Sequence, residues 1–74
     1  MKHFKKNQKV SIISDNENYA KYQNQILTVS HVAKNREEHP GYDEGVSPNY
    51  LYDLKTLEGE NVPFSLYDYE LTEA

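Results

Sequence analysis

The chain has 74 residues, a formal net charge of −4 and no cysteine. This length predicts a single small domain whose core is only just large enough to hold a fold. The lack of cysteine excludes disulfides and thiolate zinc sites and favours a reducing, cytoplasmic setting. No apolar run approaches the length that crosses a bilayer, so we expect no membrane partner.

Charge is unevenly distributed along the chain. Residues 1–9 carry Lys2, Lys5, Lys6 and Lys9 and no acid, whereas residues 35–74 carry ten acids against two basic residues. An acidic body repels a phosphate backbone, which lowers the expectation of general nucleic-acid binding. The basic N-terminal arm, residues 1–8, keeps nucleic-acid binding open as an alternative.

The first half of the chain contains two predicted strands. In Lys9–Ser14 apolar residues alternate with period two, which is typical of a strand. Gln25–Ala33 is rich in β-branched residues and predicts a second strand. Val32 follows Val29 by three positions, which breaks the alternation. A bulge near Ser30-His31 would return Val32 to the core side and bend the strand.

Two loops flank the second predicted strand. Residues 15–24 begin with turn-forming Asp and Asn side chains and leave room for one helical turn. Residues 34–49 contain two Pro and two Gly and show no sustained period. A loop of this length inside a compact domain is usually functional or mobile.

A hairpin is predicted in the second half, because two apolar and aromatic runs are joined by Glu58–Asn61. In its first run, Tyr50–Leu57, we expect Tyr52 and Leu54 to be buried. Pro63 favours an edge position for the next strand. A 3₁₀ turn at Ser65–Asp68 and a short strand at Tyr69–Thr72 should close the fold. The predicted core comprises Val10, Ile12, Leu27, Val29, Val32, Leu54, Phe64 and Leu71.

This order of elements resembles that of an SH3-like small barrel. The predicted fold is all-β: a small antiparallel SH3-like barrel of about five strands with a short 3₁₀ turn before the last strand. Residues 1–74 would form one such domain. The opening Lys5-Lys6-Asn7-Gln8-Lys9, followed by Val10 and Ile12, and the later Lys21–Ile26 also resemble KOW-type bacterial domains.

KOW-type domains usually carry glycine where this chain has Asn7 and Asn24. Asparagine adopts positive φ more readily than most residues, so the backbone geometry could be kept at both positions. This resemblance implies ribosomal or RNA binding. Leu66–Tyr69 also resembles the ALYDY signature of eukaryotic SH3 domains, but it lies at the C-terminus here, so we do not transfer the peptide-binding role.

No enzyme or cofactor is predicted. No Ser or Thr is placed with a recognisable base and orienting group. His39 and the carboxylates of residues 37–44 could clamp a divalent cation, but nothing in the sequence supplies the supporting contacts that metal ligands need. A solvated or structural loop is therefore the preferred interpretation of this segment, and we predict no metal site.

Tyrosine is the unusual feature, with seven in so short a chain. Its ring and polar tip make it common at interfaces, and a small barrel holds few of them inside. We expect Tyr67 or Tyr69 to pack over the barrel end. The others flank the two long loops, where they either cap the core or form an acid-rimmed patch. The predicted patch comprises Tyr19, Tyr22, Tyr42, Tyr50, Glu37, Glu38, Asp43 and Glu44.

The expected function is that of a non-enzymatic SH3-like module acting through protein–protein interaction, as a small accessory or regulatory protein. Its partner would be an unknown protein with a basic surface. The alternative is a KOW-like nucleic-acid-binding domain that uses Lys2, Lys5, Lys6 and Lys9, with tyrosines as stacking platforms.

Overall fold

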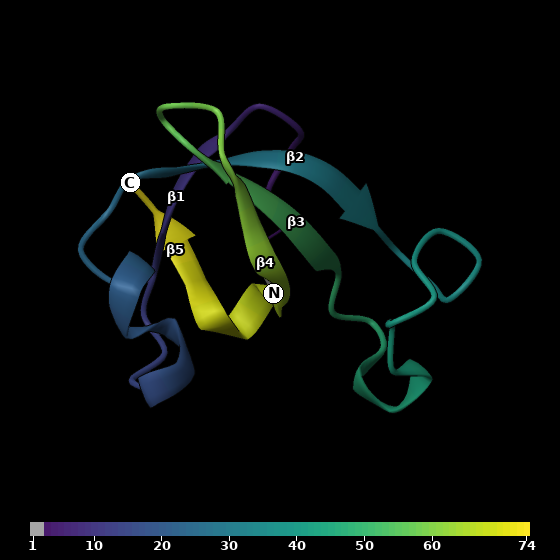
Figure 1. Ribbon diagram of the computed structural model, residues 1–74. Helices are drawn as coiled ribbons and strands as arrows, with labels where there is room; N and C mark the ends of the chain where they lie inside the picture. The colour runs from purple at the N-terminus through teal and green to yellow at the C-terminus, as the bar shows by residue number, and fades with distance from the viewer. Residues whose placement is uncertain (1–2) are drawn as a thin grey trace.

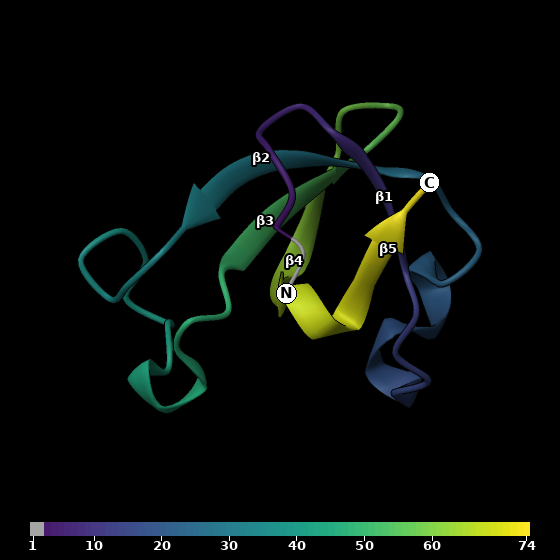
Figure 2. The same cartoon turned by 180° about the vertical axis from the view of Figure 1, so that it is seen from behind.

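The structure is a computed structural model that describes residues 3–74. Five strands in this range form one antiparallel sheet in the order β4-β3-β2-β1-β5 (Figures 1 and 2). The predicted all-β class is confirmed, including a 3₁₀ turn before the last strand. The sheet is not closed as a barrel, because β4 and β5 remain its two edges. The strands are β1 (Lys9–Ile12), β2 (Leu27–Ala33), β3 (Leu51–Thr56), β4 (Asn61–Tyr67) and β5 (Leu71–Glu73).

The bend in β2 follows the prediction. The pairing of β2 with β3 shifts register between Val29 and His31, which leaves Ser30 as the extra residue. The Ser30 hydroxyl donates a hydrogen bond to the main-chain oxygen of Asp53, 3.0 Å away. The predicted bulge is therefore confirmed, and Val32 packs against the core in a half-buried position.

Three 3₁₀ segments connect the strands: η1 (Glu17–Tyr22), η2 (Glu44–Val46) and η3 (Asp68–Glu70). The predicted 3₁₀ turn at Ser65–Asp68 is thus placed too early in the chain. Residues 65–67 stay extended because they pair with Asp53, Tyr52 and Leu51 of β3. Cross-strand hydrogen bonds at these positions outweigh the absence of apolar alternation in the sequence.

Asparagine at position 7 adopts the left-handed backbone conformation, with φ of 73°. Its N–H donates to the carbonyl of Val29, 2.7 Å away, and fixes the turn before β1. Asn7 is the only non-glycine residue with positive φ among residues 3–74. The expectation is therefore confirmed at Asn7, whereas Asn24 does not need this conformation.

The main core lies between the two halves of the curled sheet. Of the eight predicted core residues, Val32 and Phe64 are only partly buried and pack against this core. Phe4, Tyr22, Val62 and Leu66, which are not among these eight, complete the core. The other six predicted residues and Tyr52 are buried as expected: Val10, Ile12, Leu27, Val29, Leu54 and Leu71.

A second, smaller cluster lies on the opposite face of β3. Successive residues of a strand point to opposite faces, so Leu51 points away from the core that contains Tyr52. Leu51 is nevertheless buried, together with Ala33 and Tyr42. The loop at residues 34–49 folds back and covers this outer face, which explains why Leu51 is buried although the sequence analysis assigned only Tyr52 and Leu54 of this strand to the interior.

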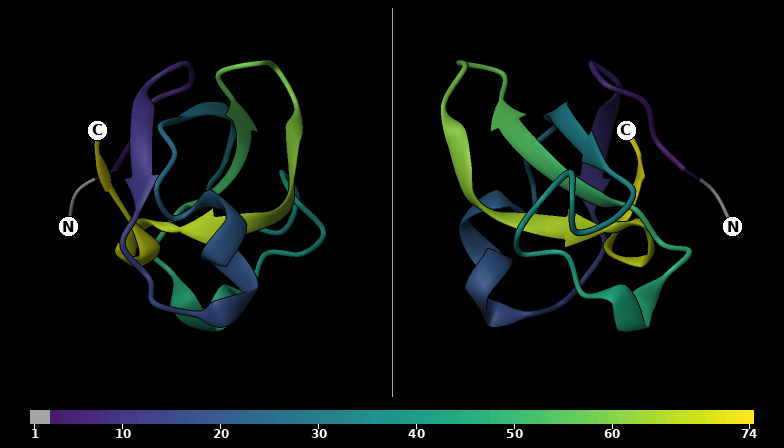
Figure 3. Two further views of the ribbon diagram at one scale, coloured as in Figure 1. Left: turned by 60° about the vertical axis from the view of Figure 1, so that its left-hand side comes forward. Right: turned by 90° about the vertical axis from the view of Figure 1, so that its right-hand side faces the viewer.

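The connections gather at two ends of the molecule (Figure 3). The three 3₁₀ segments lie at one end, which we call the helical end, with η3 between η1 and η2 (Figure 1). The turns at residues 5–8 and 57–60 lie together at the other end, the turn end, in every view. The 3₁₀ segments of the two long loops therefore share one end, but they are separated by η3.

Candidate protein-binding surface

Tyr42 is a core residue. Only 1% of its surface is exposed, and its ring meets Tyr67 edge-on, with centroids 5.9 Å apart and planes at 70°. Its hydroxyl donates to the main-chain oxygen of Asn49. The expectation that Tyr42 is exposed is wrong, because the loop that carries it turns its ring onto Leu51 of β3.

Side-chain contacts hold the same loop against the sheet. His39 Nε2 lies 3.2 Å from Asp53 Oδ1 and 3.1 Å from Ser65 Oγ. His39 Nδ1 accepts from the N–H of Gly41, 2.9 Å away, so Nε2 carries the proton in the neutral ring. The ring nitrogen that faces Ser65 is thus a donor. Ser65, His39 and Asp53 therefore lie together, and their hydrogen bonds attach the loop to the sheet.

The acidic residues of the loop remain at the surface. Glu38 and Glu44 each accept a hydrogen bond from a main-chain N–H of the loop, at 3.1 Å in both cases. Asp43 accepts from the N–H of Gly45 at 2.8 Å and caps η2. Glu37 is exposed. Within residues 3–74, His, Asp and Glu side chains form no group of three that could hold a metal ion.

Tyr19 and Tyr22 of η1 pack on Phe64 of β4. The Tyr19 and Phe64 centroids are 4.5 Å apart, and Tyr22 meets Phe64 edge-on at 5.6 Å. Tyr22 is buried in the main core, which corrects its placement on the exposed patch. Tyr19 is half-buried, so part of its surface stays available to a partner.

Tyr50 is covered by the N-terminal segment. The ring of His3 stacks on Tyr50, with centroids 3.6 Å apart and planes at 7°. His3 Nδ1 lies 2.8 Å from the buried carboxylate of Asp68, which also accepts from the Tyr50 N–H at 2.7 Å and from the Tyr52 hydroxyl. Tyr50 therefore serves mainly to anchor this segment.

The exposed aromatic surface is centred on Tyr69 of η3, which was predicted only to pack over the end of the fold. Tyr69 is 59% exposed and stacks on Tyr67, with centroids 5.8 Å apart and planes at 10°. The Tyr67 hydroxyl in turn accepts from the N–H of Asp43 at 2.9 Å. A continuous set of rings thus leads from the buried Tyr42 out to Tyr69.

Two carboxylates, those of Asp43 and Glu70, lie near the Tyr69 ring. Burial raises the pKa of the Tyr69 hydroxyl, and the nearby Glu70, Tyr67 and Asp43 raise it further. Burial also raises the pKa of Tyr19, to which Glu70 adds through its charge and a hydrogen bond. Tyr19, Tyr67 and Tyr69 with Asp43 and Glu70 form what we call the tyrosine surface, at the helical end.

The sequence contained one signal for this surface. Leu66-Tyr67-Asp68-Tyr69-Glu70 places two tyrosines two positions apart, directly before the closing strand. Because β4 continues to Tyr67 and the chain then turns into η3, the two rings stack on one another at the junction of β4 and η3. The resemblance of this segment to an SH3 signature drew attention to these residues without predicting their exposure.

The basic residues of the arm lie elsewhere. Lys5, Lys6 and Lys9 are exposed, and the turn at residues 5–8 belongs to the turn end (Figure 1). Lys2 lies outside the described residues. The described lysines of the arm and the tyrosine surface are thus at opposite ends of the domain, so these tyrosines do not form stacking platforms beside that turn.

Comparison with protein-family models, curated proteins and solved structures finds no match for the chain. In the described part of the chain, no helix has the length and apolar character needed to span a membrane.

Proposed function

We propose that this chain is a non-enzymatic SH3-like binding module that acts through protein–protein interaction, as a small accessory or regulatory protein. The SH3-like assignment is supported by the order of elements: two strands separated by a long loop, a hairpin, a 3₁₀ turn and a short closing strand. The turn at Asn7, with φ of 73°, supports a KOW-type opening.

The exposed ring of Tyr69 is the observation that carries the proposal. It is held in place by stacking on Tyr67, so a partner that packs on it immobilises little additional side chain. Tyrosine offers a large contact area at low entropic cost and is enriched in interfaces. Among residues 3–74, it is one of only four exposed large hydrophobic side chains.

The acidic residues near Tyr69 favour a basic partner. Asp43 and Glu70 lie near the Tyr69 ring and influence its hydroxyl. A guanidinium or ammonium group over a tyrosine face is attracted by the ring quadrupole, and neighbouring carboxylates strengthen the attraction. The tyrosine surface therefore suits a basic segment of another protein, with an arginine or lysine placed on Tyr69.

A titration with an arginine-containing peptide tests the proposal. A short Ala-Arg peptide should shift the NMR signals of Tyr69, Tyr19 and Asp43, whereas a matched Ala-Gln peptide should not. Tyr69→Ala should weaken peptide binding about tenfold, in line with the ~1–2 kcal/mol of an interface anchor. Leu57→Ala, which removes another exposed apolar side chain at the turn end, is the control.

If the arginine peptide causes no shifts, or if its affinity is unchanged by Tyr69→Ala, the proposed surface is wrong. Shifts confined to residues of the turn end would also contradict it, because they would place peptide binding away from the tyrosine surface.

Nucleic-acid binding by the arm is the second candidate function. Lys5, Lys6 and Lys9 are exposed, and within residues 3–74 none of them forms a salt bridge. Phosphates could therefore reach them without displacing an acid. This function would use the turn end, so it would survive Tyr69→Ala.

A further inference from the structure

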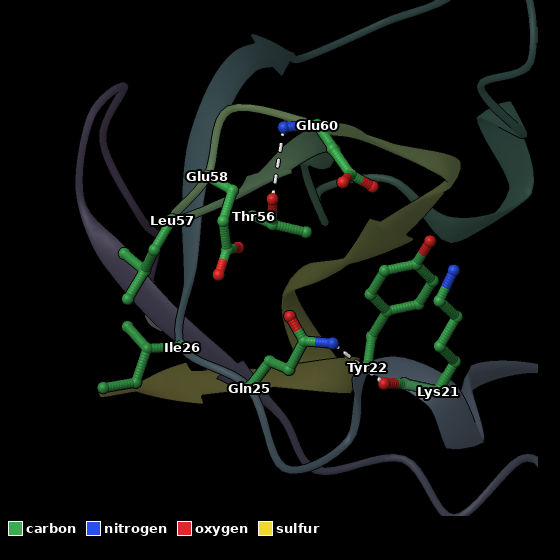
Figure 4. A pocket seen from close by; sticks show the side chains of 8 residues that line it. All are labelled: Lys21, Tyr22, Gln25, Ile26, Thr56, Leu57, Glu58 and Glu60. Atoms are coloured by element: carbon green, nitrogen blue, oxygen red, sulfur yellow. Dashed lines mark hydrogen bonds between the residues drawn. The ribbon is translucent and has the colours of Figure 1, made fainter.

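A groove with an apolar wall lies between the end of η1 and the β3–β4 turn (Figure 4). Its volume is about 580 Å³. Ile26 and Leu57 point toward one another at one side of it, and they are 46% and 61% exposed. Two of the exposed large apolar side chains of the described chain thus face water in the same place, which is typical of a contact surface.

Two carboxylates border the same groove. Glu58 and Glu60 line it from the β3–β4 turn, and both residues are exposed. Neither side chain forms an ion pair or a hydrogen bond to another described residue. The groove therefore combines an apolar wall with two carboxylates that form no ion pair within the described chain. It also contains one cation, Lys21, whose Nζ lies 5.5 Å from the centroid of the Tyr22 ring.

The turn at residues 5–8 lies at the same end of the molecule as the β3–β4 turn that lines this groove (Figures 1 and 3). Lys5 and Lys6 are exposed and unpaired within residues 3–74. Their turn is well fixed, because the Gln8 N–H donates to the Lys5 carbonyl at 3.0 Å and the Gln8 side chain accepts from the Lys5 N–H at 3.0 Å. Two cations are thus presented on an ordered backbone.

We propose that the groove is the contact surface between two copies of this chain, and that each groove receives the Lys5–Gln8 turn of the other copy. A two-fold axis perpendicular to the line joining the two turns places each basic turn opposite an acidic groove. Such an isologous contact satisfies both surfaces of both copies at once.

Shape and charge then act together. The aliphatic stems of Lys5 and Lys6 can lie along Ile26 and Leu57 of the second copy while the ammonium groups reach its Glu58 and Glu60. The charge pattern also determines how the two copies are oriented. If the second copy were rotated so that the two grooves faced each other, its carboxylates would lie against those of the first copy.

The association should be weak and dependent on concentration. A molecule with extents of 29 × 23 × 21 Å offers less at one end than the ~800 Å² per partner of a standard interface. The net charge of −4 on each copy adds general repulsion. We therefore expect dimers at high protein concentration and monomers at low concentration.

Sedimentation of the full chain from about 10 µM to about 1 mM, the range suited to small interfaces, tests the proposal. The wild type should shift toward the mass of a dimer as its concentration rises. Lys5→Glu with Lys6→Glu should remain monomeric, and so should Glu58→Lys with Glu60→Lys. An equimolar mixture of these two variants should form dimers again, because every contact regains opposite charges.

Controls separate this contact from changes in net charge or folding. Asp15→Lys with Glu37→Lys alters the same number of exposed acids outside the turn end and should dimerise at least as well as the wild type. Circular dichroism verifies that each variant is folded. If a charge variant fails to fold, Leu57→Ser, which changes no charge, replaces it and should remain monomeric.

The proposal is overturned if the wild type stays monomeric at every concentration, or if the two charge variants do not associate when mixed. It does not depend on the tyrosine surface, since Tyr69→Ala should dimerise like the wild type. Glu58→Lys with Glu60→Lys also distinguishes it from nucleic-acid binding, which the removal of two acids would not impair.

Discussion

Replacing Tyr42 with alanine should destabilise the protein far more than replacing the exposed Tyr69. Tyr42 is 1% exposed, so the change removes a buried ring from the cluster with Ala33 and Leu51. Deleting a buried aromatic side chain typically costs about 3–5 kcal/mol. That loss includes the edge-on contact with Tyr67, which alone accounts for about 0.5–1.5 kcal/mol.

A more conservative change separates the ring from its hydroxyl. Tyr42→Phe keeps the packing and loses only the hydrogen bond to the Asn49 carbonyl, which should cost about 1 kcal/mol. Tyr69→Ala should stay within about 0.5 kcal/mol of the wild type, as is usual for exposed positions. The three changes therefore predict a graded series in the free energy of unfolding.

Urea denaturation followed by far-ultraviolet circular dichroism measures this series. Total stability of a small domain is only about 5–15 kcal/mol, so Tyr42→Ala should leave little margin or none. If Tyr42→Ala and Tyr69→Ala had the same denaturation midpoint, the 34–49 loop would not be docked on β3, and the burial of Leu51 would lose its explanation.

Two further predictions concern pH and salt. Burial and the hydrogen bond to Asp68 raise the pKa of Tyr52 well above 10.0, so the folded state keeps a proton that the unfolded chain loses. This stabilisation is complete below about pH 10 and is lost as the pH rises further toward the folded-state pKa. Urea midpoints measured from about pH 8 to about pH 11.5 should therefore fall only above about pH 10, and the fall should be smaller in Tyr52→Phe. A midpoint that does not change with pH would contradict the raised pKa. If the arm binds nucleic acid, log affinity should fall with log salt by about 0.7–0.9 per Lys–phosphate contact, which gives a slope near −3 for four lysines. If the protein does not bind oligonucleotides at low salt, nucleic-acid binding is excluded as a function of the arm.

Local pattern in the sequence was enough to predict most of the sheet. Alternation in β1, the broken alternation at Val32 and the Gly-containing link before β4 each reflect interactions between near neighbours in the chain. Pro63 was correctly expected on an edge strand, because it has no N–H to give to a second neighbour. These features do not depend on distant residues, so single-sequence reasoning reached them.

The tyrosine surface could not be predicted in the same way, because tertiary contacts decide which tyrosines are exposed. Nothing around Tyr42 indicates that its loop returns to cover Leu51. Likewise, the start of η3 at Asp68 depends on β4 pairing with β3 up to Tyr67. The expected 3₁₀ turn at Ser65–Asp68 begins three residues before η3, so the sequence did not predict which surface Tyr69 occupies.

The contacts of the 34–49 loop with the sheet explain its length. A long loop in a small domain can contact a partner, or it can cover part of its own sheet. Here His39 joins the loop to Asp53 and Ser65, and Tyr42 fills the space over Leu51. Most of the loop therefore stabilises the fold. What it adds to the tyrosine surface is Asp43, whose N–H binds the Tyr67 hydroxyl and whose charge lies near Tyr69. The proposed binding surface is therefore centred on Tyr69 of η3, and the loop contributes Asp43 to its border.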